Sequence, residues 1–260
     1  MASYHAEGVA LLVRKYRGTG RVVTFFTRER GKVEAVAQGV GKPGSTLAPA
    51  VELFAHSDLL LAEGRDLDRL TQARVLEAFE KLRLDPRRLG YAGFICELLA
   101  KATEPGHPMP AAFEDLVGSL RLLDAGHEPP AVAAAASWRL LGELGVAPVL
   151  DHCVRCGTPI SGEALYLPEE GGVLCSEDAG ENQELAERGY VVRPQLRAAT
   201  HTLAELPLER LPRVKLAPGL WAELLQVTRA QVRYYLGLEL NSDAFLRQLA
   251  PPGERHGKTS

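Results

Sequence analysis

The sequence predicts a multidomain α+β protein, in which a small β-barrel precedes a helical domain that carries an inserted cysteine-containing module. Short β-rich apolar runs joined by glycine turns extend from Glu7 to about Gly64, and the apolar spacing becomes helical from Asp85. Two cysteine motifs then interrupt the helical part. The expected domains are the barrel at 1–80, the helical domain at 81–150, the module at 151–180, the second helical part at 181–250 and a disordered tail at 251–260.

Four apolar runs predict the strands of the barrel. They are GVALLV, RVVTFFT, KVEAVAQGV and VELFAHSDLLLA, which begin at Gly8, Arg21, Lys32 and Val51. The turn sequences RGTG and ERG separate the first three runs. Strands at such close spacing are typical of a meander or a small barrel. A fifth strand near Leu67 to Val75 completes a five-stranded barrel, although this segment fits a helix equally well.

Helical periodicity follows the barrel. Asp85-Pro86 is a typical helix start, because the carboxylate caps free N–H groups and proline is tolerated in the first turn. This helix covers LGYAGFICELLA and ends before Pro105. Further helices are expected at about 111–123 with a stop at Gly126, from 130 to a stop at Gly145, at 216–236, and from Asn241 or Ser242 to Leu249.

The composition indicates a soluble globular protein of a reducing compartment. The chain has 260 residues, of which 46% are hydrophobic, enough for a packed core. Its four cysteines are too few for a disulfide scaffold, and Cys96 lies in an apolar run where a buried thiol is expected. The sequence shows neither a basic leader before an apolar stretch nor an apolar segment of membrane-spanning length. We therefore expect a cytoplasmic protein that does not contact a membrane.

The charge is distributed unevenly, although the net charge is only −3. Residues 1–50 contain eight Lys and Arg against three Glu, whereas residues 51–260 contain twenty-two against thirty acidic residues. A basic segment on an acidic protein indicates contact with nucleic acid or another anionic surface. An ordinary solvated surface is the alternative explanation.

The cations of this basic segment bracket the predicted turns of the barrel. The candidate DNA-binding residues are Arg14, Lys15, Arg17, Arg21, Arg28, Arg30, Lys32 and Lys42. Cations that follow phosphates, with Tyr16, Phe25 and Phe26 nearby to stack on bases, are what a single-stranded nucleic-acid groove requires. The alternative is that the two phenylalanines belong to the core and that the cations are solvated turn residues.

The cysteine motifs have the spacing of a zinc ribbon. CVRCG begins at Cys153 and CSED begins at Cys175, a separation typical of two metal-binding knuckles. Four thiolates around one metal tie two short loops together in such a module. Only three cysteines are present in these motifs, so the fourth ligand is open and the metal is either retained or lost.

Motifs of catalysis and of nucleotide hydrolysis are absent from the sequence. GVGKPGST, at Gly39 to Thr46, has the composition of a phosphate loop but the wrong spacing and no helix behind it. No nucleophile elbow and no zinc-protease motif occurs, and the seven histidines are scattered singly. We therefore expect that the protein is not an ATPase. Catalytic triads are assembled in space and not in sequence, but no motif proposes that the protein is another enzyme.

Four segments together carry a family resemblance. They are GVALLVRKYRGTGRVVTFFTRERGKVEAVAQGVGKPGS, WRLLGELGVAPVLDHCVRCG, GGVLCSED and YYLGLELNSDAFLRQL, and the similarity covers nearly the whole chain. In this combination the chain resembles the RecO family of bacterial recombination mediators. The resemblance implies an N-terminal oligonucleotide/oligosaccharide-binding (OB) barrel, a helical domain and a zinc-binding module.

The resemblance also implies a function and partners. Members of the family bind single- and double-stranded DNA and anneal complementary strands without ATP. They interact with RecR and the single-strand binding protein, and they help to load RecA. A cytoplasmic, nucleoid-associated location follows from these roles.

The fourth metal ligand is also implied by the resemblance. Zinc-binding members of the family carry C-x-x-C twice, and Asp178 stands at the position of the fourth cysteine. His152 and Glu177 are rival donors. A carboxylate oxygen ligates zinc, although it holds the metal more weakly than a fourth thiolate. The predicted structural Zn²⁺ site consists of Cys153, Cys156, Cys175 and Asp178.

Two functions of different classes remain open. The first is a DNA-binding mediator that anneals strands and acts through protein partners. The second is a zinc-ribbon scaffold that assembles a complex and meets nucleic acid only incidentally. Charge reversal at Arg14, Lys15 and Arg17 weakens DNA binding and flattens its salt dependence in the first case, and scarcely changes the affinity in the second.

Overall fold

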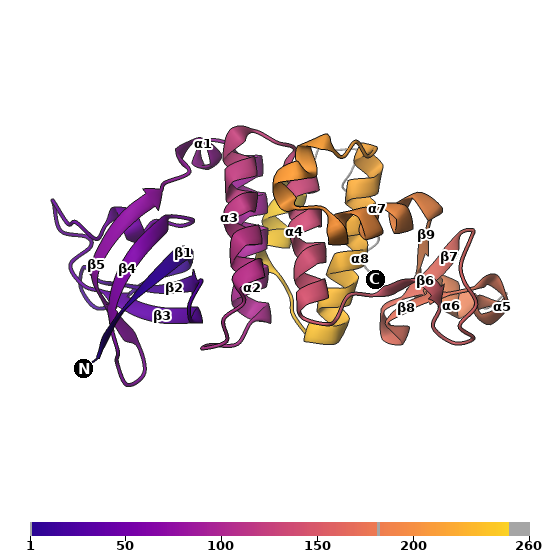
Figure 1. Cartoon of the computed structure of the whole chain (residues 1–260), viewed down its shortest axis with the longest axis horizontal. Coiled ribbons are helices and arrows are strands. Elements are labelled where there is room, and N and C mark those ends of the chain that lie inside the picture. Colours follow the sequence, from indigo (N-terminus) through magenta and orange to yellow (C-terminus); the bar gives the residue numbers. More distant parts are fainter. Residues whose placement is uncertain (1, 181–182, 250–260) are drawn as a thin grey trace. The chain divides into compact units, whose positions relative to one another are not determined.

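The computed structural model describes residues 2–180 and 183–249 (Figure 1). By their contacts these residues divide into two compact units. One unit comprises the residues up to 129 together with those from 240 onward, and the other comprises residues 130–239. The domain boundaries expected at 80, 150 and 180 lie inside these units and stay predictions. The predicted tail at 251–260 lies outside the described residues.

Five strands form a closed barrel at the start of the first unit (Figure 1). They pair in the order β1-β2-β3-β5-β4, and β4 returns to β1. All neighbours are antiparallel except β3 and β5. The strands are β1 Ser3–Lys15, β2 Arg21–Thr27, β3 Gly31–Ala37, β4 His56–Ala62 and β5 Asp68–Glu77. A sheet domain followed by helices confirms the mixed α+β class.

The barrel core follows from the alternation of apolar residues along the strands. Phe25 of β2, Leu59 and Leu61 of β4, and Leu70 of β5 meet in one buried cluster, because successive side chains of a strand face opposite sides. Full burial of each such side chain contributes roughly 1.5–3 kcal/mol. The segment that fitted a strand and a helix equally well forms β5, and a short helix, α1 Glu80–Arg83, follows it.

Two helices of the first unit begin and end where the sequence predicts. The Asp85 carboxylate accepts hydrogen bonds from the N–H groups of Arg87 and Arg88, at 2.9 and 3.3 Å, and so caps α2 Pro86–Ala102. The next helix, α3 Pro110–Ala125, ends at Gly126, whose φ of 93° lies in the left-handed region that favours glycine. A 3-10 turn at Pro49–Val51 precedes β4 in the barrel.

The last helix, α9 Asn241–Leu249, packs on α2 and therefore belongs to the first unit. The N–H groups of Asn241 and Ser242 each donate to the Glu97 carboxylate at 2.8 Å, and the Lys101 ammonium lies 2.8 Å from it. Burial alone raises the pKa of Glu97, but Lys101 and the two N–H groups lower it overall. A buried anion thus caps the helix that returns the chain to this unit.

The second unit combines helices with a four-stranded sheet of order β6-β8-β7-β9 (Figure 1). The strands are β6 Val149–Cys153, β7 Ala164–Leu167, β8 Gly172–Leu174 and β9 Tyr190–Val192. The helices are α4 Pro129–Glu143, α5 Ser176–Ala179, α6 Gln183–Arg188, α7 Pro194–Glu205 and α8 Pro218–Leu236, with 3-10 turns at Pro168–Glu170 and Leu208–Arg213. Helices α4 and α8 confirm two of the predicted helical segments.

The small sheet is anchored by a buried polar chain. The Tyr166 hydroxyl of β7 donates to Gln231 of α8, and the Gln231 amide donates to the Val146 carbonyl at 2.8 Å. Cys153, Leu167 and Leu174 form the apolar centre of the sheet. Within the described ranges, no helix combines the length and the hydropathy that a membrane span requires.

Candidate functional site

The eight predicted DNA-binding residues lie at two opposite ends of strand β2. Arg14, Lys15, Arg17 and Arg21 surround the β1–β2 turn, and Lys42 lies on the segment that packs against this turn through the N–H of Gly41, which donates to the Thr19 carbonyl at 3.0 Å. We call these five residues the barrel tip. Arg28, Arg30 and Lys32, at the β2–β3 turn, form the barrel base. Seven strand residues, roughly 20 Å, separate the two ends.

Three cations of the barrel tip are not neutralised. Lys15, Arg17 and Lys42 are exposed and have no carboxylate or carbonyl partner among the residues that the structure describes. The Arg17 guanidinium lies 6.0 Å from the centre of the Tyr16 ring. Arg14 pairs with Glu34 at 3.0 Å on the exposed surface, and such a pair is worth about 0–1 kcal/mol. The tip therefore presents positive charge that an external anion can bind.

The barrel base uses its cations inside the protein. Arg28 is hydrogen-bonded to Glu7, at 3.0 and 3.2 Å, and to Glu114 of α3, and its guanidinium lies 4.8 Å from the Phe113 ring centre. Bonding to Glu7, and then to Glu114, raises the pKa of Arg28 although burial opposes this. These contacts hold the barrel against α3.

The other two cations of the barrel base, Arg30 and Lys32, also have partners within the protein. Arg30 pairs with Glu63 at 3.0 Å and stacks on the Tyr4 ring at 3.7 Å. Lys32 donates to the carbonyls of Ala100, at 2.7 Å, and Thr103, at the carboxyl end of α2, where a cation is favoured by the helix dipole. Gly31 is required between them, since a Cβ there overlaps the His107 carbonyl.

A cation that the sequence did not single out lies beside the barrel tip. Cross-strand pairing places Arg14, Val22, Val36 and Arg69 in one row over β1, β2, β3 and β5. Arg69 is exposed and has no carboxylate partner within the described part of the chain. Its position depends on β5 being a strand, which the sequence left open.

The aromatic residues near the turns divide clearly between core and surface. Phe25 and Phe26 are both 0% exposed, which confirms the core alternative and removes them as stacking platforms. Tyr16 is 36% exposed beside Arg17. Tyr16 is therefore the aromatic side chain of the tip that is accessible for stacking on a nucleotide base.

A charge network around the buried His56 is connected to Arg28 of the barrel base through Glu7. His56 is 3% exposed, and its Nε2 lies 2.8 Å from Glu7 and its Nδ1 3.0 Å from Glu77. Arg121 of α3 holds Glu77 in turn, with contacts from 2.6 to 3.0 Å. Arg28 and His56 lower the pKa of Glu7 despite burial, and Arg121 and then His56 lower that of Glu77.

Replacing His56 with alanine is expected to destabilise the protein by about 2 kcal/mol, because two half-buried carboxylates then face each other across a cavity. Because the pKa values of both carboxyl groups are lowered in the fold, the wild-type network stabilises the protein at pH values above 4.5, the ordinary pKa of a glutamate. This stabilisation is lost as the pH falls below 4.5. Urea unfolding at neutral and acidic pH measures both the cost of the substitution and its pH dependence.

Arg74→Ala is the control, because it removes an exposed ion pair with Asp58. It is expected to lower the free energy of unfolding by less than about 0.5 kcal/mol. Equal costs for the two variants would contradict the network's role.

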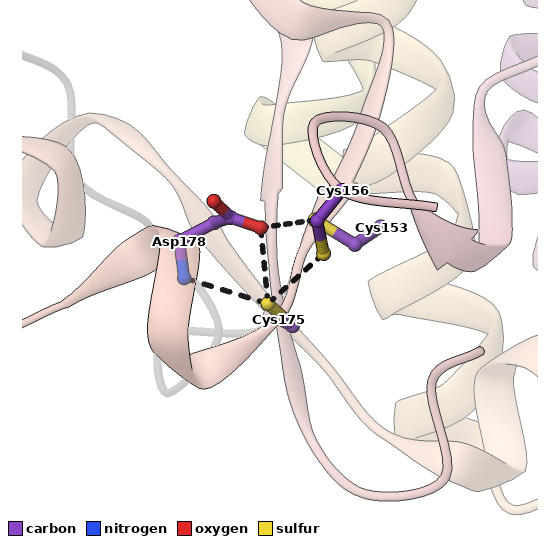
Figure 2. Close-up of side chains that lie close together, drawn as sticks. All are labelled: Cys153, Cys156, Cys175 and Asp178. Atoms are coloured by element: carbon purple, nitrogen blue, oxygen red, sulfur yellow. Dashed lines mark hydrogen bonds between the residues drawn. The ribbon is translucent and has the colours of Figure 1, made fainter. Parts of the chain in front are cut away.

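The structure brings the four predicted metal ligands together (Figure 2). Their ligand atoms all lie within 4.8 Å of one another. Cys156 Sγ and Cys175 Sγ are 3.7 Å apart, and Asp178 Oδ2 is 3.0 Å from Cys153 Sγ and 3.2 Å from Cys175 Sγ. Two sulfurs at about 2.3 Å from a tetrahedral zinc are separated by about 3.8 Å, so the residues fit this metal.

Local backbone geometry explains how the four ligands converge. Cys153 ends β6, and its carbonyl accepts from the N–H of Gly157, which has a φ of 75°. Cys175 follows β8 and precedes α5, where the Asp178 N–H lies 3.4 Å from its sulfur. The tight turn after β6 and the short helix α5 after β8 therefore point their ligands at one place.

Contacts within the cluster shift the pKa values of its ligand side chains. Hydrogen bonds from Cys156, Cys153 and Cys175 lower the pKa of Asp178 to about 2. Burial raises the pKa of Cys153, but backbone N–H groups, first that of Cys156, lower it overall. The Asp178 N–H lowers the pKa of the Cys175 thiol, but the Asp178 carboxylate and burial raise it overall to about 11. Asp178 and Cys153, but not Cys175, are thus shifted toward the ionised species that ligates a divalent cation.

The rival donors lie outside this cluster. His152 is hydrogen-bonded to Asp151 at 2.8 Å, and neither His152 nor Glu177 belongs to the described group of convergent ligand atoms. Arg155 pairs with Glu170 and lies 3.5 Å from the Asp178 carbonyl, which fixes the turn beside the cluster. Among the described residues, Asp178 is thus the donor whose oxygen faces the three sulfurs.

Comparison with known proteins gives the class to which this architecture belongs. A family model described as "Recombination protein O N terminal" matches residues 1–79, and one described as "Recombination protein O C terminal" matches residues 83–244. Both descriptions name proteins of DNA recombination.

Curated relatives agree with these matches. A "DNA repair protein RecO" of Moorella thermoacetica is 34% identical over 250 residues, covering 95% of this chain and 91% of the relative. A protein of the same name from Bacillus cereus is 33% identical over 243 residues, covering 94% of this chain and 96% of the relative. The chain belongs to the RecO family, and this membership supports a role in DNA repair and recombination.

Proposed function

We propose that this protein is a DNA-binding recombination mediator. It binds single- and double-stranded DNA and anneals complementary strands without ATP. Together with RecR it helps to load RecA on DNA that is coated by the single-strand binding protein. Family membership supports this proposal, and the unpaired cations of the barrel tip are the structural observation that carries it.

The barrel is proposed to be an OB-fold. Five strands in the order β1-β2-β3-β5-β4 support this, and OB-folds bind oligonucleotides with the face of strands 2 and 3 and with the β1–β2 loop. The barrel tip includes that loop. Arg28, Arg30 and Lys32 lie at the opposite end of β2 from this loop and have partners within the fold. The proposed DNA-binding set is therefore the barrel tip, Arg14, Lys15, Arg17, Arg21 and Lys42, of which Arg14 also pairs with Glu34 on the exposed surface, together with Arg69.

The proposed mechanism of annealing requires no bond chemistry. Cations of the tip release counterions from the phosphates and reduce the repulsion between two strands. Tyr16 stacks on a base beside Arg17, and stacking is tolerant of sequence. Both effects leave the hydrogen-bonding edges of the bases free to pair, so complementary strands anneal without an ATPase site.

The cysteine cluster is proposed to be a zinc-ribbon-like structural site. Cys153 and Cys156 hold the metal from the end of β6 and the turn after it, and Cys175 and Asp178 hold it from the start of α5. Zinc supplies cross-linking of the two turns in such sites and contributes folding free energy. The small apolar centre of this sheet makes such a cross-link valuable for its stability.

Fluorescence anisotropy with a labelled single-stranded oligonucleotide, followed by an annealing assay with its complement, tests the proposed function. We expect binding at low salt that weakens steeply as salt increases, and faster annealing in the absence of ATP. Failure to bind DNA even at low salt would overturn the mediator proposal. A zinc-ribbon scaffold with only incidental nucleic-acid contact would then be the better account.

A further inference from the structure

The metal cluster contains a pair of sulfur atoms that are close together and open to solvent. Cys156 is exposed and Cys175 is half-buried, and their Sγ atoms are 3.7 Å apart (Figure 2). We propose that this pair is a peroxide-sensitive modification site, at which Cys156 and Cys175 form a disulfide and release the metal. The inference about metal release rests on the proposed zinc site.

The geometry favours this pair over pairs that include Cys153. Cys153 is 0% exposed and lies in the apolar centre of the small sheet, where a peroxide does not reach it. Cys156 lies on the turn after β6 and Cys175 on the turn after β8, so the two side chains approach from different segments. Small side-chain rotations bring 3.7 Å to the roughly 2.0 Å of an S–S bond.

The reaction balances with hydrogen peroxide as the oxidant. The Cys156 thiolate attacks one peroxide oxygen and becomes a sulfenic acid, and the other oxygen leaves as water after it takes a proton. The Cys175 thiolate then attacks the sulfenic sulfur, and the hydroxyl leaves as a second water after it takes a proton. The two sulfurs are oxidised by two electrons in total, and the peroxide is reduced.

Disulfide formation removes two of the four ligands at once. Cys153 and Asp178 alone do not satisfy the tetrahedral coordination that zinc takes in structural sites, so the metal leaves. The new covalent bond joins the same two turns that the metal had joined. The small sheet therefore keeps a cross-link in both states, and a dithiol reductant together with zinc restores the first state.

The carboxylate at position 178 makes this exchange easier than at a site of four thiolates. Oxygen is a harder donor than sulfur and holds zinc less strongly, so loss of two thiolates leaves a weak residual site. Cys96 provides an internal control for the reaction. It is 1% exposed, and burial raises the pKa of its thiol, which keeps it unreactive.

The test treats the zinc-loaded full-length chain with hydrogen peroxide and reads out three quantities: free thiols after denaturation, zinc captured by a chromogenic chelator, and tryptic peptide masses. We expect free thiols to fall from four to two, with one zinc released per disulfide. No Lys or Arg lies between Cys156 and Arg188, so trypsin leaves Cys156 and Cys175 in one peptide, at 156–188. The expected disulfide therefore lowers the mass of that single peptide by two hydrogen atoms.

Other disulfides give a different pattern. Cys153 lies in the separate tryptic peptide at 140–155, so a bond from Cys153 links two peptides. That product, or oxidation of single cysteines without any disulfide, would overturn the proposal. Cys156→Ser and Cys175→Ser are each expected to abolish the mass change, whereas Cys96→Ser is expected to leave it intact. If the purified protein binds no zinc, the metal proposal fails by itself, and the peptide masses still decide on the disulfide.

Discussion

Charge reversal of the three unpaired tip cations, Lys15, Arg17 and Lys42, to glutamate is expected to weaken binding to single-stranded DNA by about two orders of magnitude. Lys15 and Lys42 have no side-chain partner among the described residues, and Arg17 contacts the Tyr16 ring at 6.0 Å, so their replacement is expected to remove the proposed phosphate contacts and to leave the fold intact. Anisotropy at one low salt concentration measures the loss. Unchanged thermal unfolding verifies that the variant is folded.

A matched control separates the location of the charge from its amount. Arg210, Arg213 and Lys215 are also exposed, and their triple reversal changes the net charge by the same amount from a site in the second unit. We expect this control to bind DNA within about threefold of the wild type. Equal losses in the two variants would contradict a DNA site at the barrel tip, because affinity would then follow net charge alone.

Exchange of the fourth metal ligand is expected to have the second large effect. Asp178→Cys completes a set of four thiolates and is expected to raise zinc affinity by about tenfold or more, because sulfur is the softer donor. Asp178→Ala removes the oxygen that lies 3.0 and 3.2 Å from two of the sulfurs and is expected to lower the affinity by at least about tenfold. Competition with a chromogenic chelator ranks the three proteins.

Two neighbouring donors serve as controls for this ranking. Glu177→Ala and His152→Ala remove side chains that lie outside the convergent group, so zinc affinity is expected to stay within about twofold. If Asp178→Ala bound zinc as tightly as the wild type, Asp178 would not be a ligand. A loss of affinity in His152→Ala alone would instead identify the histidine as the fourth donor.

Local sequence signals predicted the elements whose geometry is set within a few residues. The Asp85 cap, the stop at Gly126 and the short strands between glycine turns depend on neighbouring residues alone. The segment of β5 was ambiguous, because DLDRLTQARVLEAFEKL suits a helix as well as a strand, and pairing in the barrel decides between them. The return of α9 to the first unit was not predictable, since it depends on Glu97, a residue 144 positions before Asn241.

The candidate sites were likewise predictable only where residues close in the sequence determine the geometry. The spacing of the cysteine motifs, with Asp178 assigned through the family resemblance, gave a ligand group that the structure brings together, because two short turns fix it. Charge composition located the basic segment but did not separate the barrel tip from the barrel base. That separation depends on partners far along the chain, such as Glu114 for Arg28, 86 residues away. A single histidine in an apolar run likewise gave no signal for the network around His56.

The salt dependence of DNA affinity tests most directly whether the barrel tip binds phosphates. For single strands, the slope of log K against log salt concentration falls by about 0.7 for each phosphate contact that is lost. The slope for the Lys15, Arg17 and Lys42 triple reversal is therefore predicted to be shallower than the wild-type slope by about 2. Identical slopes for the two proteins would contradict the account, because the tip cations would then make no contact with the DNA backbone.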